Sequence, residues 1–223
     1  MQDSFKMSAF GVLGAMLFPL LLAAQPSWSG RLATGAGLTN LRDASDHLAG
    51  QAKPGSVIGF GVAYQPDKHF GIQAEFLFEQ KGNRPEITLT DIEGNPISTG
   101  QAKARFNYLV LPVTFHWRLG NDRLRYGPYL GTYWARLLQQ TFVVAIGDDN
   151  TFKEDQRDHY GKSDIGAVAG FAADFALDEL FSLTLETRYS LSLINTAILD
   201  NQKAYHQSLA FLIGLRFAIG KEI

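Results

Sequence analysis

The sequence predicts an all-β fold: an eight-stranded antiparallel up-and-down barrel that crosses a membrane, preceded by a cleaved signal peptide. Three observations lead to this prediction. Apolar residues alternate with small or polar ones along most of the chain, the connections between these segments are short and long in turn, and an apolar leader comes first. Side chains on a strand alternate between faces, so each segment has one apolar face and one small or polar face.

The first residues have the layout of a secretory signal. Lys6 precedes an apolar stretch from Ala9 to Ala24, which is interrupted by Pro19. A basic start, an apolar middle and a small residue at the cleavage site are typical of such signals. A transmembrane anchor is the alternative, but this stretch is short and contains a proline. We expect residues 1–24 to be the signal peptide and residues 25–223 to form the barrel domain.

The composition excludes several classes of protein. The 223 residues include no cysteine, which excludes disulfides, thiolate metal sites and thiol chemistry. The formal net charge is −2, and no basic stripe suggests a nucleic-acid partner. The mean hydropathy of −0.06 and the lack of a second long apolar run exclude a helical membrane protein.

Eight segments are expected to form strands, and most are long enough for a membrane crossing. A tilted crossing needs roughly 9–11 residues, whereas strands of globular proteins average about 5–6. In chain order, the segments are residues 30–41, 56–65, 69–82, 101–118, 126–144, 164–177, 181–193 and 208–219.

The first four segments show the alternation to different degrees. Segment 30–41 is rich in glycine and small residues, so its two faces are not assigned. Segment 56–65 sets Ile, Phe, Val and Tyr against Val, Gly and Ala, and segment 69–82 sets Phe and Ile mainly against Gln, Glu and Lys. Segment 101–118 places Leu, Val, Phe and Trp opposite Tyr, Thr, His and Arg.

The last four segments include the clearest pattern and the least clear one. Segment 126–144 contains adjacent aromatic residues, which leave its facing ambiguous. Segment 164–177 sets Ile, Ala and Phe against Gly, Val and Asp, and segment 181–193 sets Leu and Phe against Ser, Thr, Glu and Arg. Segment 208–219 is the clearest, because Leu, Phe and Ile fill one face and small residues with one arginine fill the other.

The connections alternate in length. Short ones comprise residues 66–68, 120–123 and 178–179, and long polar ones comprise residues 42–55, 83–100, 145–163 and 195–205. Short turns at one rim and long loops at the other are typical of outer-membrane barrels. A soluble lipocalin-like barrel is the rival, but its apolar faces should point inward, whereas here the opposite faces carry the charges.

Several motifs also resemble those of the PorT-like outer-membrane barrel proteins. The glycine-bearing segment 34–41 resembles their first strand, and residues 106–113 (FNYLVLPV) and 127–131 (GPYLG) resemble the two central strands. Segments 164–170 and 188–191 are similar to the sixth and seventh strands. The resemblance implies a small outer-membrane barrel and no shared reaction. Many outer-membrane barrels end on an aromatic residue used in assembly, whereas this chain ends on Ile223.

Charged residues of both signs share the inferred inner face. An eight-stranded barrel is just wide enough for side chains to fill it, and buried charges must pair. We therefore expect a structural network of ion pairs, with a gated ion path or paired-carboxylate catalysis as alternatives. Its members are Glu75, Glu79, Arg118, Asp174, Glu186, Arg188 and Arg216.

Other candidate sites have simpler explanations. His206 and Ser208 have the spacing of a lipid deacylase pair, but Ser208 shares the parity of the inner face and would not reach lipid. The acidic loop 147–159 offers oxygen ligands for calcium but lacks EF-hand spacing, so a solvated loop is expected. Residues 93–96 are expected to turn a hairpin that extends the third and fourth strands.

Aromatic residues are expected to include those that line the membrane interfaces. The candidates are Trp28, Trp117, Tyr126, Tyr129, Tyr133, Trp134 and Tyr189.

The expected function is a structural or interaction role in the outer membrane, through the long outer loops or the periplasmic rim. Apolar luminal residues such as Leu77 and Leu212 add bulk to the charged lumen, which favours this role over the alternative of a narrow pore or small-solute transporter. We expect no catalytic, cofactor or metal residues and no nucleic-acid partner. The expected partners of this monomeric barrel are outer-membrane lipid and an envelope or surface protein.

Overall fold

The computed structural model describes residues 27–42, 50–90, 93, 95–146, 150–154, 161–196 and 203–220. The expected signal peptide lies outside this part of the chain. Within these residues, no helix has both the length and the apolar character that a membrane crossing requires.

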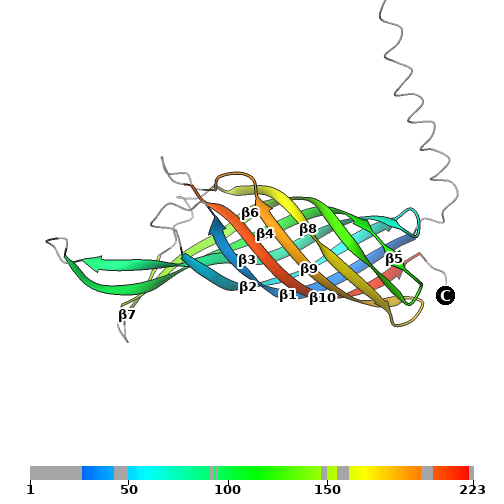
Figure 1. The fold of residues 1–223 in the computed structure, drawn as a ribbon, viewed down its shortest axis with the longest axis horizontal. Coiled ribbons are helices and arrows are strands. Elements are labelled where there is room, and N and C mark those ends of the chain that lie inside the picture. Colours follow the sequence, from blue (N-terminus) through cyan, green and yellow to red (C-terminus); the bar gives the residue numbers. More distant parts are fainter. Residues whose placement is uncertain are drawn as a thin grey trace, which may run out of the picture.

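Eight long strands form the body of the molecule (Figure 1). The long strands are β1 (Ser27–Arg42), β2 (Gly50–Gln65), β3 (Phe70–Thr90), β4 (Pro96–Trp117), β6 (Leu124–Ile146), β8 (Ser163–Ala176), β9 (Phe181–Ser192) and β10 (Tyr205–Ile219). Two short strands, β5 (Leu119–Gly120) and β7 (Asn150–Glu154), pair with β6.

The eight long strands pair in chain order and close on themselves. Each is antiparallel to the next, β4 pairs with β6, and β10 returns to β1 from Trp28↔Ile219 to Arg42↔Tyr205. This confirms the predicted up-and-down barrel. Closure leaves no open sheet edge within the barrel, so each long strand there has partners on both sides, as hydrocarbon requires.

The outward face of the barrel carries a broad apolar band. Large apolar side chains on every long strand point away from the barrel, and Phe60 and Phe211 are 58% and 62% exposed. On β3 the band extends from Phe70 to Phe78, the length of a tilted crossing of roughly 9–11 residues. Such a surface is costly in water and favourable in lipid.

Aromatic residues border this band at the end with the short turns. The Trp28 ring packs against the Tyr64 ring at a tilted angle, with 4.9 Å between ring centroids, and the Phe70 ring lies 6.3 Å from that of Trp117. Of the expected interface residues, Tyr129 and Tyr133 are exceptions, because both are buried inside the barrel. The prediction for these two residues is wrong: their hydroxyl groups bond to luminal carboxylates.

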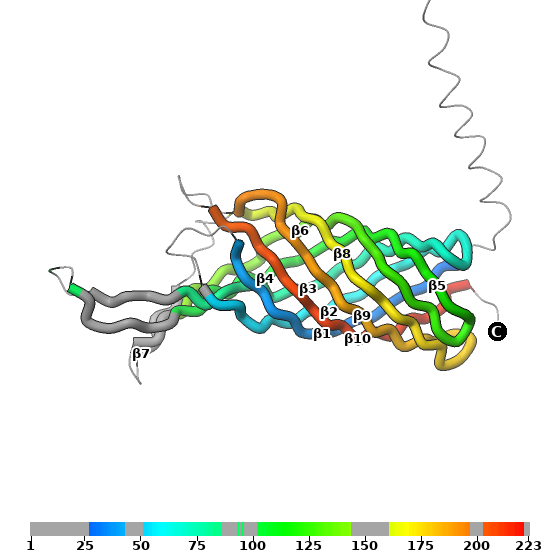
Figure 2. Tube along the Cα trace, viewed as in Figure 1, coloured from blue at the N-terminus to red at the C-terminus, as the bar shows by residue number. Residues whose placement is uncertain are grey.

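Three neighbouring strands continue beyond the barrel at the end with the long connections (Figure 1), and Figure 2 traces the barrel from which they extend. β3, β4 and β6 have 21, 22 and 23 residues, whereas β9 has 12. The β3–β4 register continues from Glu86↔Gln101 to Thr90↔Pro96. The predicted hairpin extension is therefore confirmed, and the expected polar loop at residues 83–100 consists largely of strand.

Candidate functional site

Among the residues that the structure describes, ten charged side chains are buried in the lumen and balance one another. All seven residues predicted from the sequence are among them, each with at most 8% of its surface exposed. The cations are Arg31, Lys81, Arg118, Arg188 and Arg216, and the carboxylates are Glu75, Glu79, Asp164, Asp174 and Glu186. They form three groups along the barrel.

The central group is a ring of alternating charges. Arg31 pairs with Glu75 at 2.9 Å and with Glu186 at 2.6 Å, and Arg188 pairs with the same two carboxylates at 2.5 and 2.7 Å. The Tyr129 hydroxyl donates to Glu186 Oε1 at 2.6 Å. Each buried ion therefore contacts two of opposite sign, which offsets much of its desolvation cost.

The strand order explains how these side chains fit together. Arg31 on β1 and Glu75 on β3 are separated by Gly61 of β2, which aligns with both. A Cβ at Gly61 would lie 2.7 Å from Glu75 Cγ, so only glycine leaves room for this pair to meet. Small residues between large ones are typical of tightly filled small barrels.

A second group lies near the end with the short turns. Arg118 Nη1 pairs with Asp174 Oδ2, and Arg216 Nε lies 3.6 Å from Asp174 Oδ1. Thr184 donates to Asp174 at 2.7 Å, and Arg216 Nη2 donates to Gln73 Oε1 at 2.9 Å. Arg216 therefore joins Asp174 and not the central ring.

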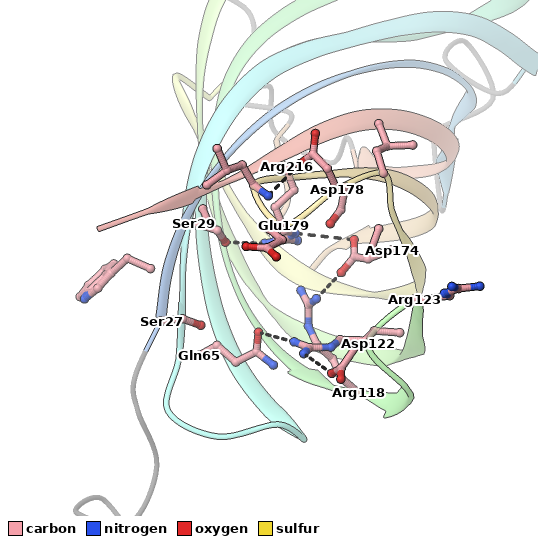
Figure 3. A pocket seen from close by; sticks show the side chains of 17 residues that line it. Ser27, Ser29, Gln65, Arg118, Asp122, Arg123, Asp174, Asp178, Glu179 and Arg216 are labelled. Carbon is pink, nitrogen blue, oxygen red and sulfur yellow. Dashed lines mark hydrogen bonds and ion pairs between the residues drawn. The ribbon is translucent and has the colours of Figure 1, made fainter. Parts of the chain in front are cut away.

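This second group lines the inner part of an open vestibule (Figure 3). The cavity has a volume of about 1110 Å³ and is lined further out by charged turn residues such as Asp122, Arg123, Asp178 and Glu179. Arg118, Asp174 and Arg216 point into it in Figure 3. The vestibule is thus a water-accessible mouth with charges of both signs.

The third group lies toward the end with the long connections. Lys81 Nζ is 3.9 Å from Glu79 and 3.7 Å from Asp164, and it lies 4.7 Å from the centroid of the Tyr133 ring. Asp164 accepts bonds from Tyr133 at 3.0 Å and from Ser192 at 2.6 Å. This group therefore combines ion pairs, hydroxyl donors and a cation–π contact.

The histidine and serine with deacylase spacing lie in the lumen and have other partners. Ser208 donates to Glu79 at 3.1 Å, and His206 Nε2 lies 3.1 Å from the Tyr108 hydroxyl. Both residues are buried on the inner face, away from the apolar band.

Sequence reasoning identified seven members of the network and missed three. Lys81 and Asp164 had the inner-face parity but were not included, and Arg31 lies on the segment whose faces were not assigned. The two tyrosines were missed because adjacent aromatic residues obscure the pattern of β6. The signal that could have found Tyr129 and Tyr133 is the glycine pair of β8, Gly170 and Gly166, which align with them.

The expected acidic loop lies largely outside the described residues. Its described part, residues 150–154, is β7 and pairs with β6. Among the residues that the structure describes, no group of three or more His, Asp or Glu side chains could hold a metal ion.

Comparison with known proteins identifies the family. Residues 23–197 match the model of the outer membrane protein β-barrel domain. No curated protein matches the chain.

Solved structures similar to the chain include several outer-membrane proteins. They include neisserial surface protein A (13% identity, 86% of this chain and 96% of that chain, TM-score 0.44). OprG from Pseudomonas aeruginosa has 12% identity over 89% of this chain and 97% of that chain, with a TM-score of 0.49. The protease OmpT from Escherichia coli has 10% identity over 86% and 97%, with a TM-score of 0.42. On the family match, the chain belongs to the outer membrane β-barrel domain family and is an integral protein of the outer membrane.

Proposed function

We propose that the protein is a closed, monomeric membrane anchor that presents an interaction surface outside the cell. The projecting part of the β3–β4–β6 sheet supports this role. Strand residues beyond the apolar band do not stabilise a lipid contact, so their length favours contact with something outside the bilayer. The long connections of outer-membrane barrels lie on the extracellular side.

The filled lumen argues against the alternative of a narrow pore. In a water-filled channel the luminal charges would be exposed, whereas Arg31 and Glu186 in the central ring are 1% and 4% exposed. Leu77, Val110 and Leu212 are equally buried and add apolar bulk at the barrel wall. Eight strands leave little space beyond these side chains.

We propose further that the protein has no catalytic activity and is PorT-like. His206 is hydrogen-bonded to Tyr108 and Ser208 to Glu79, and neither side chain faces lipid. The order of the FNYLVLPV and GPYLG motifs supports the PorT-like assignment.

Two measurements test the proposed role. A photocrosslinking residue at Thr88 of the hairpin should give a reproducible crosslinked product on intact cells, and the same residue at Lys68, on a short turn, should not. Crosslinks from the Lys68 position alone would contradict an outer interaction surface and would indicate an interaction at the periplasmic rim.

Conductance measurements test the alternative of a narrow pore. In planar bilayers the pure protein should give no conductance steps, and reproducible steps would favour the pore.

A further inference from the structure

A row of amides on the outward face marks the upper edge of the apolar band. Gln80 Nε2 donates to Asn107 Oδ1 at 3.2 Å, and Asn107 Nδ2 donates to Gln139 Oε1 at 3.2 Å. The row crosses β3, β4 and β6 at the end with the long connections. On β3 it follows Phe78, the last apolar side chain of the band. Amides of this kind belong in the polar headgroup layer and not in hydrocarbon.

Four cations gather just beyond this row, on three adjacent strands. They are Lys53 of β2, Arg84 of β3, and Lys103 and Arg105 of β4. Arg105 aligns with Gly82, and Asn83 aligns with Ala104, so the same register sets Arg84 opposite Lys103. We call these four residues the cationic cluster.

A β-bulge brings Lys53 into the cationic cluster. The β2–β3 register shifts between Ala52 and Val57, and such bulges redirect side chains. Lys53 Nζ then lies 3.4 Å from Gln80 Oε1, at the amide row. The Lys53 Cδ atom lies 3.3 Å from the position that a Cβ of Gly82 would occupy. Its ammonium is within electrostatic range of Arg105, Arg84 and Lys103.

The cationic cluster differs from the luminal ions in having no acidic partners among the described residues. Each luminal charge lies within 4.0 Å of an opposite charge, whereas none of the carboxylates whose side chains the structure describes forms an ion pair with these four residues. Arg84 Nε is buried without a hydrogen-bond acceptor. Glu86 follows two residues after Arg84, and one carboxylate would still leave the cluster strongly positive.

We propose that the cationic cluster binds the phosphate groups of phosphorylated lipids in the outer leaflet. Its position above lipid-facing side chains sets the cations at the level where headgroup phosphates lie. Guanidinium groups offer planar pairs of donors that match phosphate oxygens, and the lysines add point charges. A free phosphate ion would gain nothing from the adjoining apolar band, whereas a lipid would contact both surfaces.

Native mass spectrometry of the folded mature protein in a neutral detergent tests this proposal. The probes are lipid A with two phosphates, the same lipid without phosphates, and phosphatidylcholine. The wild-type protein should bind the two-phosphate form preferentially. The double variant Lys103→Gln, Arg105→Gln changes two exposed side chains. It should bind the two-phosphate form roughly twenty-five-fold more weakly, since each cation near an anionic lipid contributes on the order of a factor of five.

The matched control removes one lysine and one arginine from the opposite end of the barrel. The variant Lys68→Gln, Arg123→Gln changes two exposed turn residues and should bind lipid A like the wild type. Raised salt should weaken wild-type binding toward the level of the first variant. Equal binding of the dephosphorylated lipid, or equal losses in both double variants, would overturn the proposal. Both variants should keep the heat-dependent gel mobility of a folded barrel.

Discussion

Arg188 shows how much the barrel interior depends on single charges. Its guanidinium pairs with Glu75 and Glu186, and its Nε lies 3.3 Å from the Tyr129 hydroxyl. The variant Arg188→Ala leaves an excess negative charge in the lumen. Breaking a buried pair in this way costs about 3–5 kcal/mol, so the urea midpoint in detergent, followed by tryptophan fluorescence, should fall clearly. An unchanged midpoint would contradict this role of Arg188.

Arg188→Lys is the informative companion at the same position. Lysine keeps the charge but lacks the planar fork that contacts two carboxylates at once. Its midpoint should therefore lie between those of the wild type and Arg188→Ala. If lysine is as damaging as alanine, the geometry of the guanidinium matters more than its charge.

Between elements, the packing of β6 against β8 depends on glycine. Gly170 aligns with Tyr129, and a Cβ there would lie 2.5 Å from the Tyr129 Oη and 2.1 Å from the Thr187 carbonyl oxygen. Gly170→Ala should thus lower the free energy of unfolding by about 1–3 kcal/mol, because overpacking a filled interior typically costs this much. The same urea titration measures the loss. The control Ala169→Val points outward into the apolar band and should be nearly neutral, so equal effects would contradict the packing argument.

The sequence predicts elements well where one face is strongly apolar and the other is not. This contrast predicted β10 and β9, whose lengths match a crossing and whose charges point inward. The contrast is missing on β1, where Gly35, Ala36 and Gly37 make the two faces alike. The inward position of Arg31 was therefore not predicted. The contrast is also missing on β6, because Tyr133 and Trp134 are adjacent and similar, although they face opposite sides.

Alternation also gives the face of a residue but not its depth. Arg216 and Glu75 share the inner face, yet Arg216 pairs with Asp174 near the vestibule and Glu75 belongs to the central ring. Depth depends on the strand registers, which alternation does not specify. The three luminal groups therefore required the structure.

The whole molecule is asymmetric along its axis. The vestibule and short turns lie at one end, together with the start of β1 and the end of β10, and the projecting β3–β4–β6 sheet lies at the other (Figure 1). The band between the ends is apolar outside, and its described residues place five cations and five carboxylates inside. For a barrel built this way we expect one orientation, with the projecting sheet on the cell surface.

The lack of cysteine makes this orientation directly measurable. A single thiol can be placed at either end, as Asn95→Cys beside the tip of the β3–β4 hairpin or as Lys68→Cys on the β2–β3 turn, and both positions are exposed. A membrane-impermeant maleimide added to intact cells should label Asn95→Cys and leave Lys68→Cys unlabelled until the outer membrane is permeabilised. The reverse labelling pattern would place the vestibule on the cell surface. The projecting sheet and the cationic cluster would then lie on the periplasmic side, which would contradict both proposals.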